Sequence, residues 1–536
     1  MPTLFTALRA HTQRQKAQRQ KAQPTVSAVA PAVGQPGYTA EIVAVPTEAP
    51  RTVRKLNEPK RKMSLRDRFL INGKAVRLRK VIVVGGGFAG LSAAYELESL
   101  GYQVTVVEGQ AEVGGRVQSC RQIVPGNVME KGAELIGLNH PAWWSYKRKF
   151  DLHFRQLSDP PSPPVFLDGK RVVGAMAQDL SREMDGVQKR INRIARRVHA
   201  HEPWKSRNAA ALDRLSLVQA LNRIPMSRLC RLAFKELLQT DNGVRAERQS
   251  WLGNLAMIKG GGLSRFWTDT ETHHCVEGNQ GLAFAFKAKL KKVRLNSKVK
   301  SIEIQRNRVR VSVSKTVWFE GDDVVVAIPP TMWGEITFRP TLPTSYSVQF
   351  GNNVKYLLNV RKGSWRPEAP DMITDGPVDL TWDGTDGQVG RRAGLVAFSG
   401  ADDALTCRRW SKKRYLKELG IVYPHLVKSC GKGKLVDWPG NKWTKGSYSF
   451  PKPGEVTRAG PLLHAGFLKR IHFAGEHTCY AFTGYMEAAL QSGIRVAEQI
   501  ARRDGVLGRK RRQRSRRTRP KSNVPSLPNV VMPSPS

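Results

Sequence analysis

The sequence predicts an α/β fold that contains a Rossmann-like, dinucleotide-binding domain, and three observations support this prediction. A short run of β-branched residues, 81–84, is followed at once by a glycine-rich turn and a helical segment. A second apolar run, residues 102–107, ends at the acidic Glu108. A glycine pair and an arginine follow at 114–116. This order is typical of a parallel sheet that holds a dinucleotide at the carboxyl ends of its strands.

The glycine-rich turn has the spacing G-x-G-x-x-G, at Gly85, Gly87 and Gly90. The first glycine permits a tight turn, the second lets the backbone approach a pyrophosphate, and the third lets the helix pack on the strand. Backbone N–H groups at the start of the helix attract phosphates. The strand before the turn is too apolar for an exposed edge, so it suits the middle of a parallel sheet.

The acid and the later arginine fit the same dinucleotide. Glu108 lies 18 residues beyond Gly90, about where a carboxylate accepts hydrogen bonds from ribose hydroxyls, and a glutamate there favours an unphosphorylated ribose. Arg116 follows Gly114 and Gly115 and can pair with a phosphate in bidentate fashion.

These motifs, with others further along the chain, resemble the flavin-containing amine oxidases, a family that includes monoamine oxidases, polyamine oxidases and L-amino-acid oxidases. Residues 470–500, RIHFAGEHTCYAFTGYMEAALQSGIRVAEQI, are similar to the closing FAD-binding motif of that family. The resemblance spans roughly residues 79–502. Its internal landmarks, in the order of the family, are KGAELIG at 131–137, VVVAIPP at 324–330, NNVKYLLNVRKGSW at 352–365 and WTKGSYSFPKPGE at 443–455.

The resemblance implies that the cofactor is FAD. Ser447 stands where animal monoamine oxidases carry the cysteine that tethers the flavin, so we expect non-covalent binding. Val299 would hold the adenine end, Glu476 would open the last helix near the ribityl or phosphate region, and Met486 would lie beneath the flavin ring. The residues implied to bind FAD are Gly85, Gly87, Phe88, Ala89, Gly90, Glu108, Gly114, Gly115, Arg116, Gly132, Ala133, Glu134, Val299, Gly475, Glu476, Tyr485 and Met486.

The chemistry implied by the family is hydride transfer from the carbon beside an amine to flavin N5. The resulting imine is hydrolysed to a carbonyl compound, and O₂ reoxidises the flavin to give H₂O₂. Three residues match the catalytic positions of the family. Lys355, in an otherwise apolar segment, matches the lysine that reaches flavin N5 through a water. Tyr448 and Tyr485 match the two aromatic positions on either side of the amine, where π faces orient its lone pair.

The substrate class stays open at this stage. The arginine that amino-acid oxidases carry just beyond the equivalent of Gly132 is absent, since Ala133-Glu134-Leu135 stands there. Polyamine oxidases place a histidine or an acid in this loop; the chain has Gly137 at the histidine position and Glu134 as a possible acid. An uncharged or aromatic monoamine is therefore favoured, with L-amino-acid oxidation close behind. Trp143, Trp144 and Trp251 are candidates to line the substrate entry, although tryptophans usually belong to the core.

Two readings from other classes remain. The scaffold also carries desaturases and protoporphyrinogen-type oxidases, but Lys355 and the tyrosine pair argue against them because their substrates need no amine clamp. A nucleic-acid-binding protein with an amine-oxidase body would use basic tails as arms. The six cysteines show no C-x-x-C spacing, so no metal site is indicated.

The charge is concentrated at the two ends of the chain. The net charge is +44; residues 1–80 carry 17 basic and 4 acidic side chains, and residues 501–536 carry 11 and 1. Segments 1–78 and 503–536 lack apolar periodicity, so we expect disordered basic tails that contact polyanions weakly. The chain contains no stretch of ~20 apolar residues, so we expect no membrane span. We expect a cytoplasmic protein, although the basic, acid-poor N-terminus also fits an organelle transit peptide. The oligomeric state is not indicated.

The central part of the chain, ~420 residues, is long enough for two interleaved domains. Alternating apolar residues over 298–330 predict short strands, and residues 212–224 and 226–239 predict amphipathic helices. The FAD-binding domain is expected to be discontinuous and the substrate-binding domain to be α+β. The predicted segments are 79–150, 255–335 and 436–502 for FAD, and 151–254 and 336–435 for the substrate.

Overall fold

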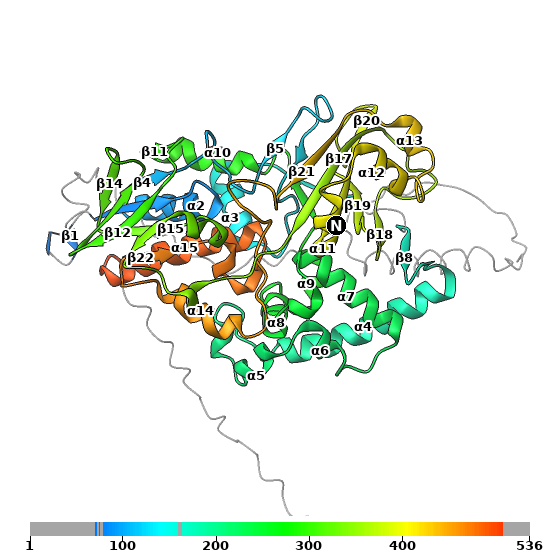
Figure 1. Cartoon of the computed structure of the whole chain (residues 1–536), viewed down its shortest axis with the longest axis horizontal. Coiled ribbons are helices and arrows are strands. Elements are labelled where there is room, and N and C mark those ends of the chain that lie inside the picture. The colour runs from blue at the N-terminus through cyan, green and yellow to red at the C-terminus, as the bar shows by residue number, and fades with distance from the viewer. Residues whose placement is uncertain (1–69, 72–73, 76–78, 159–162, 508–536) are drawn as a thin grey trace, which may run out of the picture.

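The computed structural model of the chain describes residues 70–71, 74–75, 79–158 and 163–507, which Figure 1 shows as coloured ribbons. The predicted tails, 1–78 and 503–536, lie mostly outside the described residues. Within them, β1 (Leu70–Ile71) pairs antiparallel with β2 (Lys74–Ala75). The last helix reaches Arg503, and Val506 and Leu507 pack against the core.

A five-stranded sheet carries the predicted strand–turn–helix. All of its neighbouring strands run parallel, and Val81, Val83 and Val325 are fully buried. Strands covered on both faces need continuous apolar residues rather than alternating ones. The predicted α/β class with a parallel sheet is therefore confirmed. In spatial order, the strands are β11 (Val293–Arg294), β4 (Gln103–Val107), β3 (Lys80–Val84), β15 (Asp323–Val326) and β22 (Ile471–Phe473).

Two layers cover this parallel sheet. One face packs on helices that share an apolar core with it, and the view in Figure 1 shows α15 beside α2, although the two helices come from opposite ends of the described chain. The other face packs on a four-stranded sheet. The helices are α2 (Phe88–Ser99), α3 (Pro141–Phe150), α10 (Gln280–Lys289) and α15 (Met486–Arg503), and the strands are β12 (Ser301–Gln305), β13 (Arg308–Ser312), β14 (Trp318–Gly321) and β16 (Thr337–Arg339).

The strands predicted within 298–330 are therefore present as β12 to β15. The helix predicted at 226–239 is also present, as α7 (Arg228–Asn242). The helix predicted at 212–224 is divided into α5 (Ala209–Arg214) and α6 (Leu217–Leu221). The break occurs because Ser216 caps α6 in a capping box with Gln219, and such a cap stops the preceding helix from continuing.

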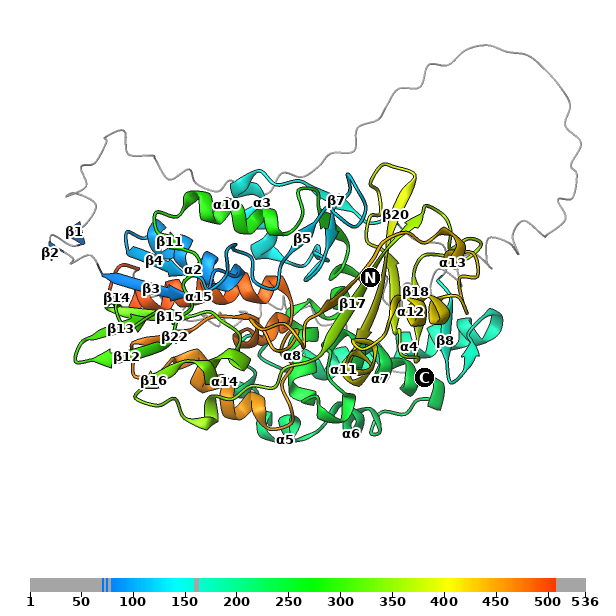
Figure 2. The same cartoon turned by 45° about the horizontal axis from the view of Figure 1, so that its top comes forward.

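A seven-stranded, mainly antiparallel sheet forms the other half of the molecule, on the right in Figure 2. Its strands, in spatial order, are β21 (Gly433–Asp437), β17 (Asn353–Arg361), β20 (Arg392–Gly400), β19 (Leu380–Asp383), β18 (Met372–Thr374), β8 (Val165–Leu167) and β9 (Lys170–Arg171). The helices of this half and of its junction with the other half are α4 (Gly174–Ala195), α8 (Trp251–Gly260), α9 (Phe266–Asp269), α11 (Ala401–Cys407), α12 (Lys412–Leu419) and α13 (Leu426–Ser429). The helix α14 (Glu455–Ala465) packs near β22 of the parallel sheet.

Two structural features relate to the predictions about membrane spans and cysteines. Within the described residues, no helix combines the length and the apolar character that crossing a membrane requires. All six cysteines are free thiols, and five of them are buried. The cytoplasmic location stays a prediction.

A buried ion pair ties the C-terminal helix to the parallel sheet. The Asp323 side chain, at the start of β15, is fully buried and accepts two hydrogen bonds of 2.7 Å from the guanidinium of Arg503. His472 on β22 lies 3.2 Å from the same carboxylate. Burial by itself raises the pKa of Asp323, but the hydrogen bonds from Arg503 and His472 outweigh it and lower the pKa to about 2.

Asp323 should make the fold acid-sensitive. Because its pKa is lower in the folded chain than in the unfolded one, its stabilisation is complete above about pH 4 and is lost as the pH falls towards 2. We expect about 2 kcal/mol of unfolding free energy to be lost over this interval. Denaturant unfolding of wild type and Asp323→Asn is measured at several pH values. The difference between their unfolding free energies, followed against pH, gives the contribution of Asp323. The neighbouring, partly exposed Asp322→Asn is the control; an equal pH dependence in wild type and Asp323→Asn would contradict the assignment.

Candidate active site

The glycine-rich turn joins β3 to α2 with its backbone held against a neighbouring loop. Gly85 has φ +110°, and a Cβ there would lie 2.8 Å from the carbonyl oxygen of Ala327. A Cβ on Gly90 would overlap the carbonyl oxygen of Gly85. Gly87 is the N-cap of α2 and offers no side chain to the first N–H groups of the helix. Those N–H groups are therefore open to a ligand at the helix start.

One cavity runs from this turn to the seven-stranded sheet. It is lined by every residue predicted to bind FAD or to act in catalysis except Gly90, which lies behind the wall of the cavity where α2 meets β3. The structure thus brings together side chains from both halves of the chain. Their individual roles stay predictions.

Glu108 lies at the end of the cavity formed by the first two strands. Its carboxylate accepts hydrogen bonds from the backbone N–H groups of Gly86, at 2.6 Å, and Gln110, at 2.8 Å. Its own backbone carbonyl accepts from Ser297, two residues before Val299. Glu108 and Val299 therefore line the same end, as expected for a group that carries both a ribose and a base.

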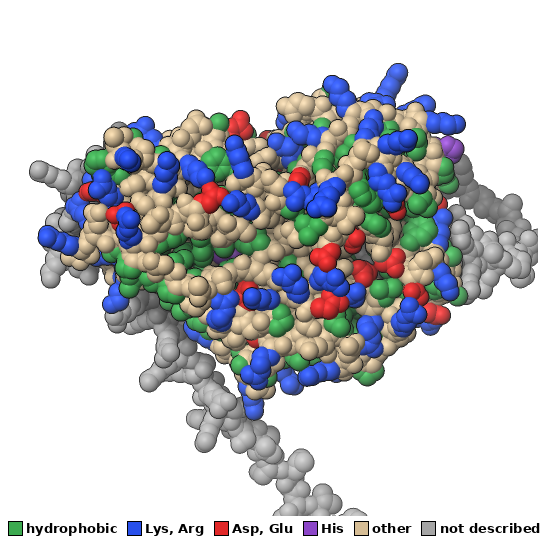
Figure 3. All heavy atoms as spheres, in the orientation of Figure 1, with side chains coloured by type: hydrophobic (Ala, Val, Ile, Leu, Met, Phe, Trp, Pro, Cys, Tyr) green, Lys and Arg blue, Asp and Glu red, His purple; other side chains and the backbone are tan. Residues whose placement is uncertain are grey.

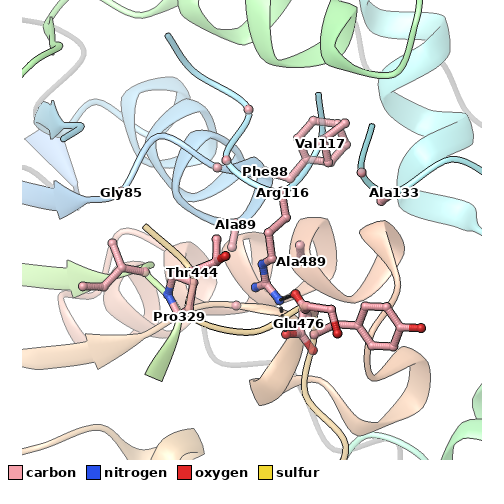
Figure 4. A pocket seen from close by; sticks show the side chains of 18 of the residues that line it. Gly85, Phe88, Ala89, Arg116, Val117, Ala133, Pro329, Thr444, Glu476 and Ala489 are labelled. Atoms are coloured by element: carbon pink, nitrogen blue, oxygen red, sulfur yellow. Dashed lines mark hydrogen bonds and ion pairs between the residues drawn. The ribbon is translucent and has the colours of Figure 1, made fainter. Parts of the chain in front are cut away.

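Arg116 is paired with a carboxylate of the chain itself. Figure 4 shows its side chain reaching across the cavity to Glu476. Arg116 Nη1 donates to Glu476 Oε1 at 2.7 Å and to the Ser447 carbonyl at 2.9 Å. Glu476 also accepts from the Ser449 hydroxyl and from the backbone N–H groups of Ser449 and Gly484. The sequence predicted that Arg116 pairs with a phosphate in bidentate fashion. It did not indicate the internal partner Glu476, which lies 360 residues away in the chain.

The expected start of the last helix is wrong. Glu476 does not open that helix but begins a short 3₁₀ turn, η7 (Glu476–Thr478), and a second turn, η8 (Tyr480–Phe482), follows. The helix α15 begins only at Met486, with Tyr485 as its N-cap. Gly484 separates them at φ +87°, a left-handed conformation that interrupts a helix. Met486, rather than Glu476, therefore places the helix start at the cavity.

Lys355 is buried in a network of acceptors. It lies on β17, which is hydrogen-bonded on both sides, to β20 and β21. Its Nζ donates to Glu134 Oε2 at 2.6 Å, to the Gly132 carbonyl at 2.8 Å and to the Glu130 carbonyl at 3.3 Å. An ammonium has three N–H donors, so these bonds use all of them. A water between Lys355 and flavin N5 would have to replace the 3.3 Å bond.

Glu134 is the carboxylate partner of Lys355 in this network. Its other carboxylate oxygen accepts from Trp382 Nε1 at 2.8 Å. Burial raises the pKa of Glu134, but Lys355 and His274 outweigh burial and lower it. A carboxylate already paired with a buried ammonium is not available to a second ammonium of a substrate, which was its possible role in the sequence.

Tyr448 and Tyr485 line the cavity together, and their hydroxyl groups contact two elements that the sequence did not single out. Tyr448 Oη donates to the backbone carbonyl of Asp241 at 2.8 Å. Tyr485 Oη donates to Glu271 Oε1 at 3.3 Å. Asp241 and Glu271 also line the cavity. Burial, followed by the charge of Glu271, raises the pKa of Asp241 well above its usual range.

The tryptophans that line the cavity are different from those considered in the sequence. Trp143 and Trp251 are core residues, at 0% and 3% exposure, and Trp144 packs against Phe154 and His273. None of these three lines the cavity. The tryptophans that line it are Trp382, Trp438 and Trp443. No local pattern distinguishes them, because each reaches the cavity only through the tertiary fold.

Several features of the cavity fit FAD. Glycines form the wall at the start of α2, and Glu108 offers a carboxylate at the other end of the turn. His477 lines the cavity, is 3% exposed, and neither ring nitrogen has a hydrogen-bond partner among the described residues. Burial lowers the pKa of His477 to about 4, so the ring is neutral and can serve a polar group of a cofactor. No cysteine is among the lining residues.

Known proteins are similar in both sequence and fold. Amine oxidase [flavin-containing] B of Homo sapiens is 26% identical over 465 residues, which cover 80% of this chain and 87% of that protein. The structure of cyclohexylamine oxidase from Brevibacterium oxydans IH-35A superimposes with a TM-score of 0.72 at 22% identity, over 79% of this chain and 99% of that one. A putrescine oxidase bound to putrescine gives a TM-score of 0.71 at 21% identity, over the same shares.

A parallel sheet with a glycine-rich turn, a carboxylate after its second strand and a cavity shared with a second sheet defines a dinucleotide-dependent oxidoreductase. The family model of the flavin containing amine oxidoreductases matches residues 88–501, so the chain belongs to this family. The chain is an FAD-dependent enzyme that acts on amines.

Proposed function

We propose that the protein oxidises a primary or secondary amine to an imine, which water hydrolyses to a carbonyl compound. Bound FAD supplies the hydride acceptor at N5, and O₂ reoxidises it to give H₂O₂. The observation that supports this proposal most is the pair of partly buried tyrosines, Tyr448 and Tyr485, in one cavity with the residues predicted to bind FAD. Their π faces can hold an amine, cationic on entry or neutral when it reacts, while the buried walls exclude water.

Oxidation of L-amino acids is less well supported. A substrate carboxylate needs a positively charged partner. The one arginine among the described residues that line the cavity is Arg116, and it is paired with Glu476. Asp241 and Glu271 would repel a carboxylate near the tyrosines.

The visible spectrum of the purified protein, followed without oxygen while amines and L-amino acids are added, tests the proposed function. We expect a flavin band that amines bleach and L-amino acids do not. Bleaching by L-amino acids alone would replace the substrate class. A flavin band that no compound bleaches would favour a desaturase-type or protoporphyrinogen-type oxidase on the same scaffold.

The tyrosines should matter more for turnover than for cofactor binding. In Tyr448→Ala and Tyr485→Ala we expect kcat/KM for amines to fall roughly 10- to 100-fold, because the amine is no longer held in a reactive orientation. FAD occupancy, measured from the ratio of flavin to protein absorbance, should change much less. Tyr448→Phe and Tyr485→Phe keep the ring faces and serve as matched controls. Equal losses of turnover and occupancy would assign both tyrosines to structure.

We also propose weak contacts with polyanions through the basic segments of the chain. Those segments lie outside the described residues, but lysine and arginine side chains are also spread over the face of the body shown in Figure 3. Such contacts should weaken steeply as salt rises. A truncation that tests them should end at residue 507, because removing Arg503 would break its pair with Asp323.

A further inference from the structure

A strip of exposed basic side chains runs along one edge of the half that contains the parallel sheet. Residues 287–300, KAKLKKVRLNSKVK, contain seven basic residues and no acidic one. They form the end of α10, the edge strand β11 and the loop that leads to β12. All seven basic residues are exposed, and we call them the basic strip: Lys287, Lys289, Lys291, Lys292, Arg294, Lys298 and Lys300.

The positive charge of the basic strip is largely unpaired. Among the described residues, Lys298 is the one member of the strip with an ion pair, to Glu335 at 2.6 Å. Figure 3 shows lysine and arginine side chains over the region where Figure 1 places α10 and β11. Cations that lie this close repel one another, and a polyanion that lies along them relieves the repulsion and releases its own counterions. The strip therefore favours an extended polyanion over a single small anion.

The basic strip lies near the place where the two basic end segments of the sequence join the body. Arg79 Nη1 pairs with the Asp504 carboxylate at 3.1 Å, so the two ends of the body lie together. Asp504 also accepts a hydrogen bond of 2.9 Å from Tyr102, which precedes β4. Val106, four residues further along, donates its N–H to the carbonyl of Lys292 at 2.9 Å. Four residues of an extended strand span about 13 Å, so both basic end segments begin close to the strip.

We propose that the basic strip binds the phosphodiester backbone of a nucleic acid, DNA or RNA. Each lysine or arginine that neutralises a phosphate releases a counterion, and the basic end segments can add contacts along the same strand. Such contacts carry no base information, so we expect little sequence preference. The inference deepens the proposed polyanion contacts by assigning them a fixed surface on the body, and it does not depend on amine oxidation.

An anionic lipid surface fits the strip less well. A segment that binds at a lipid surface usually combines its cations with apolar side chains that enter the acyl boundary. In residues 287–300 the larger apolar side chains are turned inwards: Leu290 and Val299 are buried, and Val293 and Leu295 are half-buried. The strip therefore offers a lipid surface its charges alone, whereas a nucleic acid backbone needs nothing more.

The test follows the fluorescence anisotropy of a labelled DNA duplex and of a labelled single-stranded RNA as full-length holoenzyme is added at several salt concentrations. The variant of the strip combines Lys289→Gln, Lys292→Gln and Arg294→Gln. The matched control combines Lys189→Gln, Arg193→Gln and Arg197→Gln, which removes three exposed charges from α4 and the turn that follows it. Flavin absorbance shows that each variant is folded.

We expect the strip variant to bind the duplex about ten times more weakly than wild type at physiological salt. The slope of the logarithm of the binding constant against the logarithm of the salt concentration should become shallower by about 2–3, because each lost phosphate contact removes about 0.9 from it. The control should lose less than about two-fold. Chemical acetylation followed by mass spectrometry gives a second measurement, in which nucleic acid should protect Lys289 and Lys292 but not Lys189.

Equal weakening in the strip variant and in the control would show that net charge alone is responsible, and would overturn the inference. Binding that persists without protection of the strip lysines would assign the polyanion contacts to the end segments, which also overturns it. Anionic vesicles that bind more tightly than either nucleic acid would replace the partner by a membrane surface. If no nucleic acid binds even at low salt, the inference and the proposed polyanion contacts fail together, while amine oxidation stands on its own test.

Discussion

Replacing Lys355 with methionine should slow the reaction at the flavin by about 100-fold or more, because a positioned proton-carrying side chain typically contributes this much. It should also lower the unfolding free energy by about 3 kcal/mol, since it leaves the buried Glu134 carboxylate without its ammonium. FAD should still bind. Stopped-flow measurements of flavin reduction and of reoxidation by O₂ show which half of the reaction is slowed.

The double variant Glu134→Gln/Lys355→Met separates the two effects. A neutral amide needs no ammonium, so most of the lost stability should return while the rates stay low. In Lys355→Met alone, the decrease in unfolding free energy relative to wild type should become larger as the pH rises from 5 to 8. Without Lys355, burial raises the pKa of Glu134 in the folded chain, so the unfolded chain releases the proton more readily as the pH rises. Reduction and reoxidation rates within two-fold of wild type would remove Lys355 from the mechanism.

Replacing Glu476 with alanine should abolish stable FAD binding. Glu476 accepts from Arg116, from Ser449 twice and from Gly484. Its loss leaves the partly buried guanidinium of Arg116 without its carboxylate and three other donors without an acceptor, at a cost of roughly 3–5 kcal/mol. The segment between β22 and α15 would then lose the anchor that holds it against the cavity.

The measurement for Glu476 is the FAD content after gel filtration, together with denaturant unfolding of the apoprotein. Glu476→Gln is the matched control, because its amide oxygen can still accept one or two of these bonds. It should keep part of the FAD. Full FAD occupancy in Glu476→Ala would show that the pair with Arg116 serves another purpose.

The sequence was sufficient where the chemistry is local. The strand, turn, helix and acid between residues 80 and 108 are contiguous, and each is specified by neighbours within a few positions. The strands within 298–330 and the helix α7 follow from periodicity for the same reason. Ser216 shows the limit of this approach, because one capping residue divides a helix whose apolar spacing is continuous.

The parts of the site that the sequence did not reveal are long-range pairs. The Arg116–Glu476 pair joins positions 360 residues apart, and the Lys355–Glu134 pair joins positions 221 residues apart. Asp241 carried no signal at all, because an acid near the end of an amphipathic helix normally faces solvent. Glycine and glutamate before a helix imitate a helix start, which explains why the beginning of α15 was placed at the wrong residue.

The order of the strands in the parallel sheet also bears on how the enzyme is made. β3, at the beginning of the described chain, pairs with β15, and β15 pairs with β22, only about 30 residues before the last described residue. Met486 and Glu476 belong to the same late segment. During synthesis, β22 and α15 must therefore have left the ribosome before the pocket can close around FAD. A nascent chain that stalls before β22 would expose an uncovered sheet, so the cofactor can act only as a late ligand that locks a completed fold.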